Sequence, residues 1–392
     1  MQWIALALLL PAPWVLFHNL GVHPSLLLQV LLPGCAILGA SIMLSWAAEL
    51  AEHDVPRSLA LIGLALIAVL PEYAVDMYFA WMAGKDPSYI AFATANMTGA
   101  NRLLIGLGWP AVVWAYWWKT RKPGVALEKS QSLEIFVLLV VTLYCFLIPI
   151  KGSLGLEDTV VLVSCFIFYV YAASRHPHEE PDIEEGPAAT LGRLATPLRR
   201  ACMAGFFLIS GYAIFISAEP FAEGLLALGR GWGIEQFLLV QWLAPLASES
   251  PEFIVALVFA LRNKPQVGMG ALVSSKVNQW TLLIGMLPIA YSLSLGHPAS
   301  MHLDGRQVEE ILLTAAQSLF GLAVLVNFDF SLKESFLMAG LFVSQAFFPS
   351  THVRYAFSAG YLLLSLGVVL SSPQRRHALK ELVGRVLKDL NP

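Results

Sequence analysis

The chain is a succession of long apolar windows, each close to the roughly 20 residues that cross a bilayer core. Only 13% of its 392 residues are charged and 57% are hydrophobic, whereas about 25% of residues are charged in a soluble domain. The pattern predicts an all-α polytopic membrane protein. We place about twelve windows, at about 3–18, 25–49, 57–83, 88–118, 132–150, 156–174, 201–228, 235–261, 266–294, 307–327, 331–349 and 353–370.

Basic residues in the loops set the expected orientation. The segment "WKTRKPGVALEK" at 118–129 is strongly basic, so we expect it in the cytoplasm. The same rule places 175–200, "LRNK" at 261–264 and the basic tail on that side. Both termini are then cytoplasmic, and the expected location is the cell (inner) membrane. Residues 1–20 lack the basic start of a signal peptide, which favours an extra retained helix.

A polar segment divides the chain into two membrane halves. Residues 175–200 are rich in charge, Pro and Ala and have no apolar period, which is typical of a linker. We therefore expect one membrane repeat at 25–174 and a second at 201–349. An extra helix at 353–370 and a cytoplasmic, amphipathic tail at 371–392 follow. The four cysteines have no spacing that indicates disulfides.

The two halves carry the same pair of motifs. "LPEYAVD" at 70–76 and "SESPEF" at 248–253 each place a Pro-Glu pair inside an apolar window. The sequence "LLIG" follows both: Gly106 lies 34 residues after Glu72, and Gly285 lies 33 residues after Glu252. Matching separations predict an internal repeat. The loop charges make the two Pro-Glu helices run in opposite directions, so the five-helix repeats are predicted to be inverted, as in secondary transporters.

The Pro-Glu pair has a chemical meaning inside a membrane. Proline breaks the helical hydrogen bond to the carbonyl four residues earlier, at Ile67 and at Ala247. A freed carbonyl there needs a partner, and an ionised carboxylate costs on the order of 3 kcal/mol. Hard cations such as Ca²⁺ and Na⁺ bind both oxygen types. Glu72 and Glu252 are therefore the central candidate ligands, and desolvation after ion release favours their protonation.

Polar neighbours complete a candidate oxygen shell. Each stands on the face of a Pro-Glu residue or at the centre of the following window. They are Asp76, Ser248, Glu249, Asn96, Asn101, Ser275, Asn278 and Gln279. Ordinary hydrogen bonding between membrane helices explains any single hydroxyl or amide about equally well.

These motifs resemble the alpha-repeats of the cation/Ca²⁺ antiporter superfamily, the sodium/calcium exchanger-like proteins, over about 30–120 and 205–295. The resemblance implies ten core helices in two inverted halves and alternating binding of Ca²⁺ and Na⁺ or H⁺ at Glu72 and Glu252. The sequence also departs from that family. Ala68 and Val69 replace a Thr-Ser pair, Asp76 adds a carboxylate, and the register of "NMTGAN" is ambiguous.

Two basic residues lie deep in the windows after the Pro-Glu motifs. Arg102 and Lys276 would be costly there without a partner. In one interpretation they are internal counterions that reduce the formal charge of Glu72, Asp76, Glu249 and Glu252 from −4 to −2, which suits one divalent ion, or two monovalent ions or protons. In the other they form structural ion pairs, for example with Asp76 or Glu249. Glu309 and Glu310 are interpreted only as acids at a helix start.

The combined pattern predicts a secondary active antiporter that exports Ca²⁺ in exchange for Na⁺ or H⁺ by alternating access. A Na⁺/H⁺ exchanger on the same scaffold is the alternative, and a cation channel is a weaker one. No enzyme motif is present, so we expect no catalytic residue and no cofactor. The expected partners are inorganic cations and the lipid bilayer, with no nucleic acid. Oligomeric state and ion stoichiometry stay open.

Overall fold

The structure is a computed structural model that describes residues 2–22, 24–51, 70–175, 187–348 and 350–390. Within these ranges almost all of the chain is helical, which confirms the all-α prediction. The chain forms two compact units, residues 1–79 with 177–251 and residues 80–176 with 252–392. Three features of the sequence analysis lie outside the described residues: most of the window before Pro71, the segment with Ala68 and Val69, and residues 176–186 of the linker.

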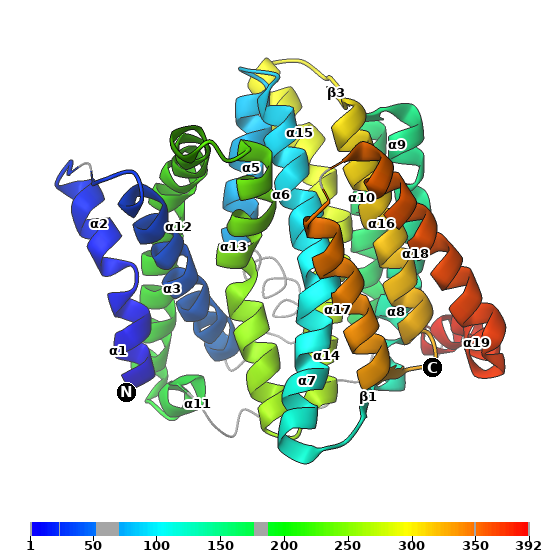
Figure 1. Ribbon diagram of the computed structural model, residues 1–392. Coiled ribbons are helices and arrows are strands. Elements are labelled where there is room, and N and C mark those ends of the chain that lie inside the picture. The colour runs from blue at the N-terminus through cyan, green and yellow to red at the C-terminus, as the bar shows by residue number, and fades with distance from the viewer. Residues whose placement is uncertain (1, 23, 52–69, 176–186, 349, 391–392) are drawn as a thin grey trace. The chain divides into compact units, whose positions relative to one another are not determined.

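The first unit is built on two long helices. Its elements are α1 (Gln2–Leu9), α2 (Ala12–Asn19), α3 (Leu28–Ala51), most of α5 (Leu70–Ala83), α11 (Pro187–Gly192), α12 (Thr196–Trp232) and the first part of α13 (Gln236–Leu261). Helices α3 and α12 lie side by side in Figure 1. Small residues such as Ala40 and Ala213 are fully buried between them, which lets the two backbones approach closely.

The second unit holds the remaining elements. They are α6 (Tyr89–Leu103), η1 (Leu104–Gly108), α7 (Trp109–Thr120), β1 (Gly124–Ala126), η2 (Lys129–Gln131), α8 (Ser132–Cys145), α9 (Leu147–Lys151), β2 (Ser153–Leu154), α10 (Leu156–Ala173), the end of α13, α14 (Pro265–Asn278), η3 (Gln279–Leu283), α15 (Ile284–Leu295), β3 (Met301–His302), α16 (Gly305–Leu325), β4 (Asp329–Ser331), α17 (Leu332–Ala346), α18 (Thr351–Ser371) and α19 (Pro373–Leu390). Strands β1 and β4 pair antiparallel, as do β2 and β3. These short ladders join loops at the ends of helices.

Both helices that follow the Pro-Glu motifs contain a π-helical turn. The first is η1, between α6 and α7, and the second is η3, between α14 and α15. A π turn inserts one extra residue per turn and is often found at functional sites. Both π turns lie beside an "LLIG" motif but not in the same register, since η1 contains Gly106 and η3 ends two residues before Gly285. The internal repeat and its inversion stay predictions.

The glycines of the two "LLIG" motifs allow other helices to approach closely. A Cβ atom on Gly106 would lie 2.2 Å from the ring of Phe342 in α17. A Cβ atom on Gly285 would lie 3.1 Å from Val163 in α10, and the Gly285 carbonyl accepts a hydrogen bond of 2.7 Å from Thr159 Oγ1. The repeated glycine therefore marks two packing positions of the second unit.

Several helices are long and apolar enough to cross a membrane. Among the described residues six qualify singly, and a seventh qualifies if the two parts of α13, Gln236–Ser250 and Glu252–Leu261, form one broken span. The break at Pro251 agrees with the expected effect of a proline inside a helix. The predicted total of about twelve spans stays a prediction.

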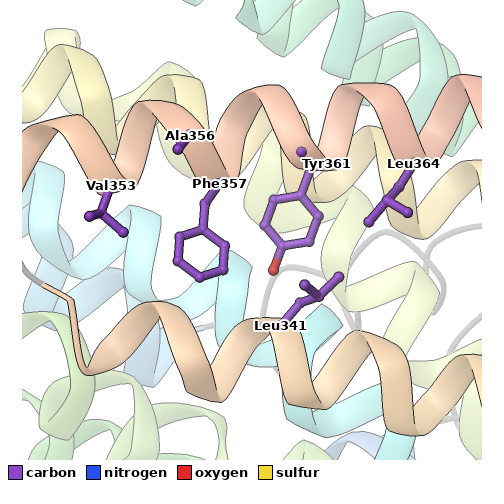
Figure 2. Close-up of a pocket in the computed structure, with 7 residues that line it drawn as sticks. Leu341, Val353, Ala356, Phe357, Tyr361 and Leu364 are labelled. Atoms are coloured by element: carbon purple, nitrogen blue, oxygen red, sulfur yellow. The ribbon is translucent and has the colours of Figure 1, made fainter.

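A shallow groove between α17 and α18 is apolar. It has a volume of about 240 Å³ and is lined by Leu341, Val353, Ala356, Phe357, Gly360, Tyr361 and Leu364 (Figure 2). The Tyr361 hydroxyl is the one polar side-chain group among these residues. Carbon-lined grooves do not replace the hydration shell of a cation, so the groove is not an ion site.

Candidate functional site

The first Pro-Glu motif opens helix α5. Glu72 and Asp76 are 4% and 0% exposed and stand one helical turn apart on the same face. Two residues further on, the Tyr78 hydroxyl donates a 2.9 Å hydrogen bond to Glu223 Oε1 of α12. Glu223 is half-buried. The first unit thus holds a buried carboxylate pair and, nearby, a carboxylate that accepts from tyrosine.

The second Pro-Glu motif lies in the middle of α13. Ser248 and Glu249 are 5% and 1% exposed, whereas Glu252 is partly exposed. The Ser248 hydroxyl lies 3.3 Å from the Ala244 carbonyl oxygen. Ser248 and Glu249 belong to the first unit and Glu252 to the second. The structure shows how deeply each carboxylate is buried. That one ion binds all four of them stays a prediction; they are Glu72, Asp76, Glu249 and Glu252.

The helices after the motifs bury a row of amides. Asn96 and Asn101 of α6 and Gln279 of η3 are all 0% exposed, and Asn278 is 4% exposed. Ser275 is partly exposed. Among the described residues, neither amide atom of Asn96 or of Gln279 has a hydrogen-bond partner. A buried amide without a partner costs about 1–3 kcal/mol, so both side chains are available to a ligand that supplies the missing bonds.

Lys276 connects α14 to α6, the two helices that follow the Pro-Glu motifs. Its ammonium group donates a 2.5 Å hydrogen bond to Asn101 Oδ1 and lies 4.2 Å from the centroid of the Trp280 ring. Asn101 Nδ2 in turn donates to the Met97 carbonyl at 2.7 Å. Lys276 is 1% exposed, so a fixed cation is held in the interior by an amide oxygen and an aromatic face. Asn101 Oδ1, a predicted ion ligand, is bonded to this cation.

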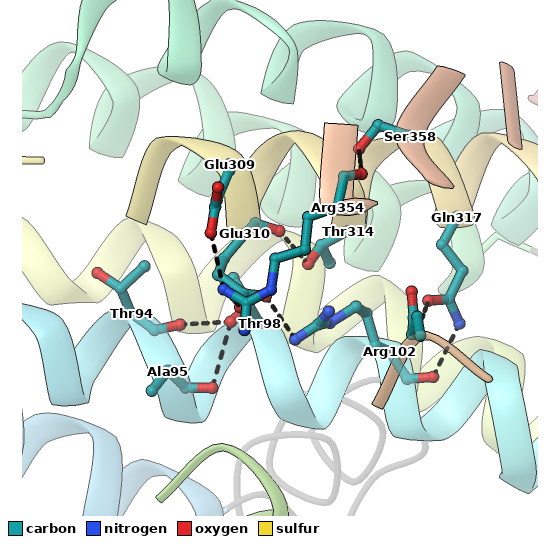
Figure 3. A network of polar contacts seen from close by, with 11 residues as sticks. Thr94, Ala95, Thr98, Arg102, Glu309, Glu310, Thr314, Gln317, Arg354 and Ser358 are labelled. Carbon is teal, nitrogen blue, oxygen red and sulfur yellow. Dashed lines mark hydrogen bonds and ion pairs between the residues drawn. The ribbon is translucent and has the colours of Figure 1, made fainter. Parts of the chain in front are cut away.

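Arg102 belongs to a buried network of four charges. Its Nη2 lies 2.6 Å from Glu310 Oε2 on α16. Arg354 of α18 lies 2.7 Å both from Glu310 Oε1 and from Glu309 Oε1 (Figure 3). All four side chains are at most 6% exposed. These two arginines and two glutamates sum to zero formal charge, and the half-buried Arg306 of α16 also interacts with both glutamates.

Hydrogen bonds extend this network along α6. Gln317 Nε2 of α16 donates to the Arg102 carbonyl at 3.1 Å, and Gln345 Nε2 of α17 donates to Gln317 Oε1 at 3.2 Å. Thr98 Oγ1 donates to the carbonyls of Thr94 and Ala95 in its own helix (Figure 3). Thr94 Oγ1 donates to the Ile90 carbonyl at 2.8 Å. The segment of α6 that carries Asn96 and Asn101 is therefore fixed to α16 by its next residue, Arg102.

Sequence reasoning missed three members of the network. Glu309 and Glu310 lie inside α16, which begins at Gly305 with Asp304 and Gln307 as a capping box. They are buried by packing against other helices, so their nearness to the helix start is incidental. Arg354 lies in the window predicted at 353–370. A charge inside an apolar window is the signal that could have identified it.

The described residues form no cluster of side chains that would hold a permanently bound metal ion. Within the described ranges no three His, Cys, Asp or Glu side chains gather closely enough to hold a metal ion. The candidate ligands above are carboxylates, amides and hydroxyls spread over both units, and all except Glu252 and Ser275 are buried. Such oxygens are suited to a cation that is bound and released as cargo.

Comparisons with known proteins agree with this description. A model of the family "Sodium/calcium exchanger protein" matches residues 25–175 and 203–351. A crystal structure of the H⁺/Ca²⁺ exchanger CAX has a TM-score of 0.94 and 46% sequence identity, and covers 99% of this chain and 98% of its own.

More distant structures share the fold. Native YfkE has a TM-score of 0.61 at 14% identity, over 93% of this chain and 100% of that chain. The sodium-calcium exchanger NCX_Mj has a TM-score of 0.53 at 17% identity, over 81% of this chain and 95% of that chain. No curated protein matches. Because the family model matches both membrane halves, the resemblance expected from the Pro-Glu motifs is confirmed, and the chain belongs to the sodium/calcium exchanger protein family.

Proposed function

We propose that this chain is an integral membrane antiporter that exports Ca²⁺ in exchange for protons. The observation that carries the proposal is the 46% identity, over 99% of the chain, with a solved H⁺/Ca²⁺ exchanger. Its family is one of exchangers rather than enzymes. Ca²⁺ and H⁺ are then substrates, and no cofactor is required. We place the protein in the cell membrane with both termini in the cytoplasm, following its basic loops.

The buried carboxylates supply the chemistry of exchange. Ca²⁺ bound at Glu72 and Glu252 neutralises charges that are costly in a low-dielectric interior. When the ion leaves, the same desolvation favours the protonated carboxyl groups. One set of oxygens can therefore hold either Ca²⁺ or protons but not both at full occupancy. Alternating exposure of that set to the two sides of the membrane couples the two flows.

Lys276 favours protons over Na⁺ as the coupling ion. Na⁺ needs a shell of several oxygen ligands, whereas a proton needs one carboxylate oxygen. The Lys276 ammonium group occupies Asn101 Oδ1, which removes one amide oxygen from a possible Na⁺ shell. The Lys276 ammonium group thus occupies the Asn101 amide oxygen that a sodium-coupled site could use as a ligand.

The formal charge of the candidate site also differs from the value of −2 obtained with two counterions. Arg102 pairs with Glu310, so we assign Lys276 as the counterion of the four predicted carboxylates. Four negative charges and one positive charge leave a formal charge of three negatives. One Ca²⁺ with one retained proton brings the formal charge of the site to zero, and so do three protons without Ca²⁺. The proposal is then an exchange of two protons for each Ca²⁺.

Ion flux in proteoliposomes tests the proposal. Purified protein is reconstituted, and ⁴⁵Ca²⁺ uptake is measured under a pH gradient or under a Na⁺ gradient at equal pH on both sides. We expect the pH gradient to drive uptake and the Na⁺ gradient to have no effect. Uptake driven by Na⁺ alone would replace the proposal with sodium/calcium exchange. Na⁺ flux driven by a pH gradient without Ca²⁺ would identify a Na⁺/H⁺ exchanger, and ion currents that need no counter-ion would identify a channel.

A further inference from the structure

Helix α19 has an apolar arc wider than the surface that the protein covers. Ala378, Leu382 and Val386 are 7%, 1% and 3% exposed and pack against the second unit. The residues that follow each of them, Leu379, Val383 and Leu387, are 37%, 50% and 56% exposed. At 100° per residue these form a second apolar stripe beside the buried one. Within the described part of the chain, this second stripe is left uncovered.

The exposed stripe is accompanied by positive charge. Arg376 and Lys380 are exposed, and each stands seven residues, or about two turns, before a member of the stripe, Val383 and Leu387. Glu381 lies on a different face, where it pairs with Arg385 at 2.8 Å. Among the side chains that the structure describes on α19, the stripe is therefore flanked by cations only.

The contacts of α19 place it at the ends of membrane-spanning helices. It begins at Pro373, two residues after α18 ends at Ser371, and turns away from that end of α18 (Figure 1). The Arg375 guanidinium group pairs with Glu334 in the first turn of α17 and donates to the Val324 carbonyl at the end of α16. The Arg385 guanidinium group lies 5.3 Å from the ring centroid of Phe328, which follows α16. The helix thus lies along the level at which α16 ends and α17 begins.

We infer that α19 is an interfacial helix that binds an anionic lipid surface. Its second stripe enters the boundary between acyl chains and headgroups, and Arg376 and Lys380 reach the phosphates. A basic residue near a negative leaflet strengthens binding by about fivefold, so two give on the order of 30-fold. A second copy of the same face is a poor partner, because two-fold symmetry would bring like charges together. The basic loop at 118–129 lies at the same level, because its strand β1 pairs with β4 between α16 and α17, and we place this loop at the cytoplasmic leaflet.

Spin-labelled lipids test the choice of lipid. The full-length protein is reconstituted in phosphatidylcholine vesicles with spin-labelled phosphatidylglycerol or phosphatidylcholine, and the motionally restricted fraction is compared. We expect a preference for phosphatidylglycerol that falls several-fold in Arg376→Gln/Lys380→Gln. The matched control, Lys85→Gln/Arg230→Gln, removes two exposed cations, one in the turn after α5 and one in the last turn of α12, and keeps the preference. An equal fall in both double variants, or no preference at all, overturns the inference.

A second measurement tests the depth of the stripe. In a background with the four cysteines replaced by serine, a nitroxide is attached at Val383→Cys or, as a control on another face, at Glu381→Cys. In vesicles that contain phosphatidylglycerol we expect the label at 383 to collide with oxygen and to be shielded from an aqueous nickel complex. The label at 381 collides with nickel. Equal nickel collision at both positions, or shielding of 383 from both reagents as at a protein interface, contradicts lipid contact. Retained Ca²⁺ exchange shows that each variant is folded.

Discussion

Arg102 Nη2 lies 2.6 Å from Glu310 Oε2, and both side chains are almost completely buried. This ion pair joins the residue that follows Asn101 on α6 to the second turn of α16. Arg354 joins the same carboxylate to α18, a helix that begins at the end of the region matched by the family model. The predicted extra helix is therefore bonded directly to the core that carries the candidate ligands.

Removing the negative charge of Glu310 is expected to destabilise the protein strongly. Glu310→Gln leaves two buried arginines with one glutamate, and removing one partner of a buried pair costs about 3–5 kcal/mol. Thermal unfolding of the purified protein in detergent measures the loss. The control is Glu157→Gln, because Glu157 pairs with Lys151 but is 59% exposed, where an ion pair contributes about 1 kcal/mol or less. Equal melting temperatures for Glu310→Gln and wild type would show that the network is not formed.

Removing both members of the pair gives a different outcome. Arg102→Met/Glu310→Met deletes opposite charges together and leaves Arg354 with Glu309 at 2.7 Å. Replacing a whole buried pair by apolar groups is often nearly neutral, so the double variant is expected to be more stable than Glu310→Gln alone. A double variant less stable than the single one would contradict the charge-balance account.

Asn96 and Asn101 are expected to respond oppositely to the same substitution. Asn96→Leu removes a buried amide that has no partner among the described residues, so it should stabilise the ion-free protein by about 1–3 kcal/mol and abolish the rise in melting temperature on addition of Ca²⁺. Asn101→Leu breaks the bonds to Lys276 and Met97 and should destabilise. A normal Ca²⁺ response in Asn96→Leu would remove Asn96 from the ligand set.

Lys276 is expected to set the affinity for Ca²⁺ through its charge. At an effective dielectric constant of about 20, a unit charge and a divalent ion about 10 Å apart interact by about 3.3 kcal/mol. Lys276→Met should therefore lower the Ca²⁺ concentration for half-maximal uptake by on the order of 100-fold at fixed pH, whereas Lys276→Arg, which keeps the charge, should change it little. Initial rates of ⁴⁵Ca²⁺ uptake give both values. Unchanged affinity and stoichiometry in Lys276→Met would rule out its role as a counterion.

The glycine of the first "LLIG" motif is expected to tolerate no side chain. Because a Cβ atom on Gly106 would lie 2.2 Å from the Phe342 ring, Gly106→Ala should cost about 1–3 kcal/mol by overpacking. Gly340→Ala is the matched control in α17, since nothing lies within 4 Å of its added carbon and helical Gly→Ala changes usually stabilise. Equal effects of the two substitutions on the melting temperature would contradict the packing.

The sequence predicted those features that depend on local composition and spacing. Apolar windows, the break at Pro251 and the burial of Asp76 and Lys276 follow from hydropathy and from the cost of charge in a membrane. The partners of Arg102 and Lys276 could not be predicted, because Glu310 and Asn101 lie 208 and 175 residues away and their choice depends on helix packing. The π turns at 104–108 and 279–283 were missed for a similar reason, since no propensity distinguishes them from α-helix.

The central claim is that Glu72 and Glu252 bind Ca²⁺ and protons in alternation. Its most direct test is ⁴⁵Ca²⁺ uptake driven by a pH gradient in proteoliposomes, with internal pH followed by a trapped dye. Wild type and the exposed-carboxylate control Glu157→Gln should show Ca²⁺ uptake coupled to proton exit, and Glu72→Gln and Glu252→Gln should each show neither. Full coupled exchange in either glutamine variant would contradict the account.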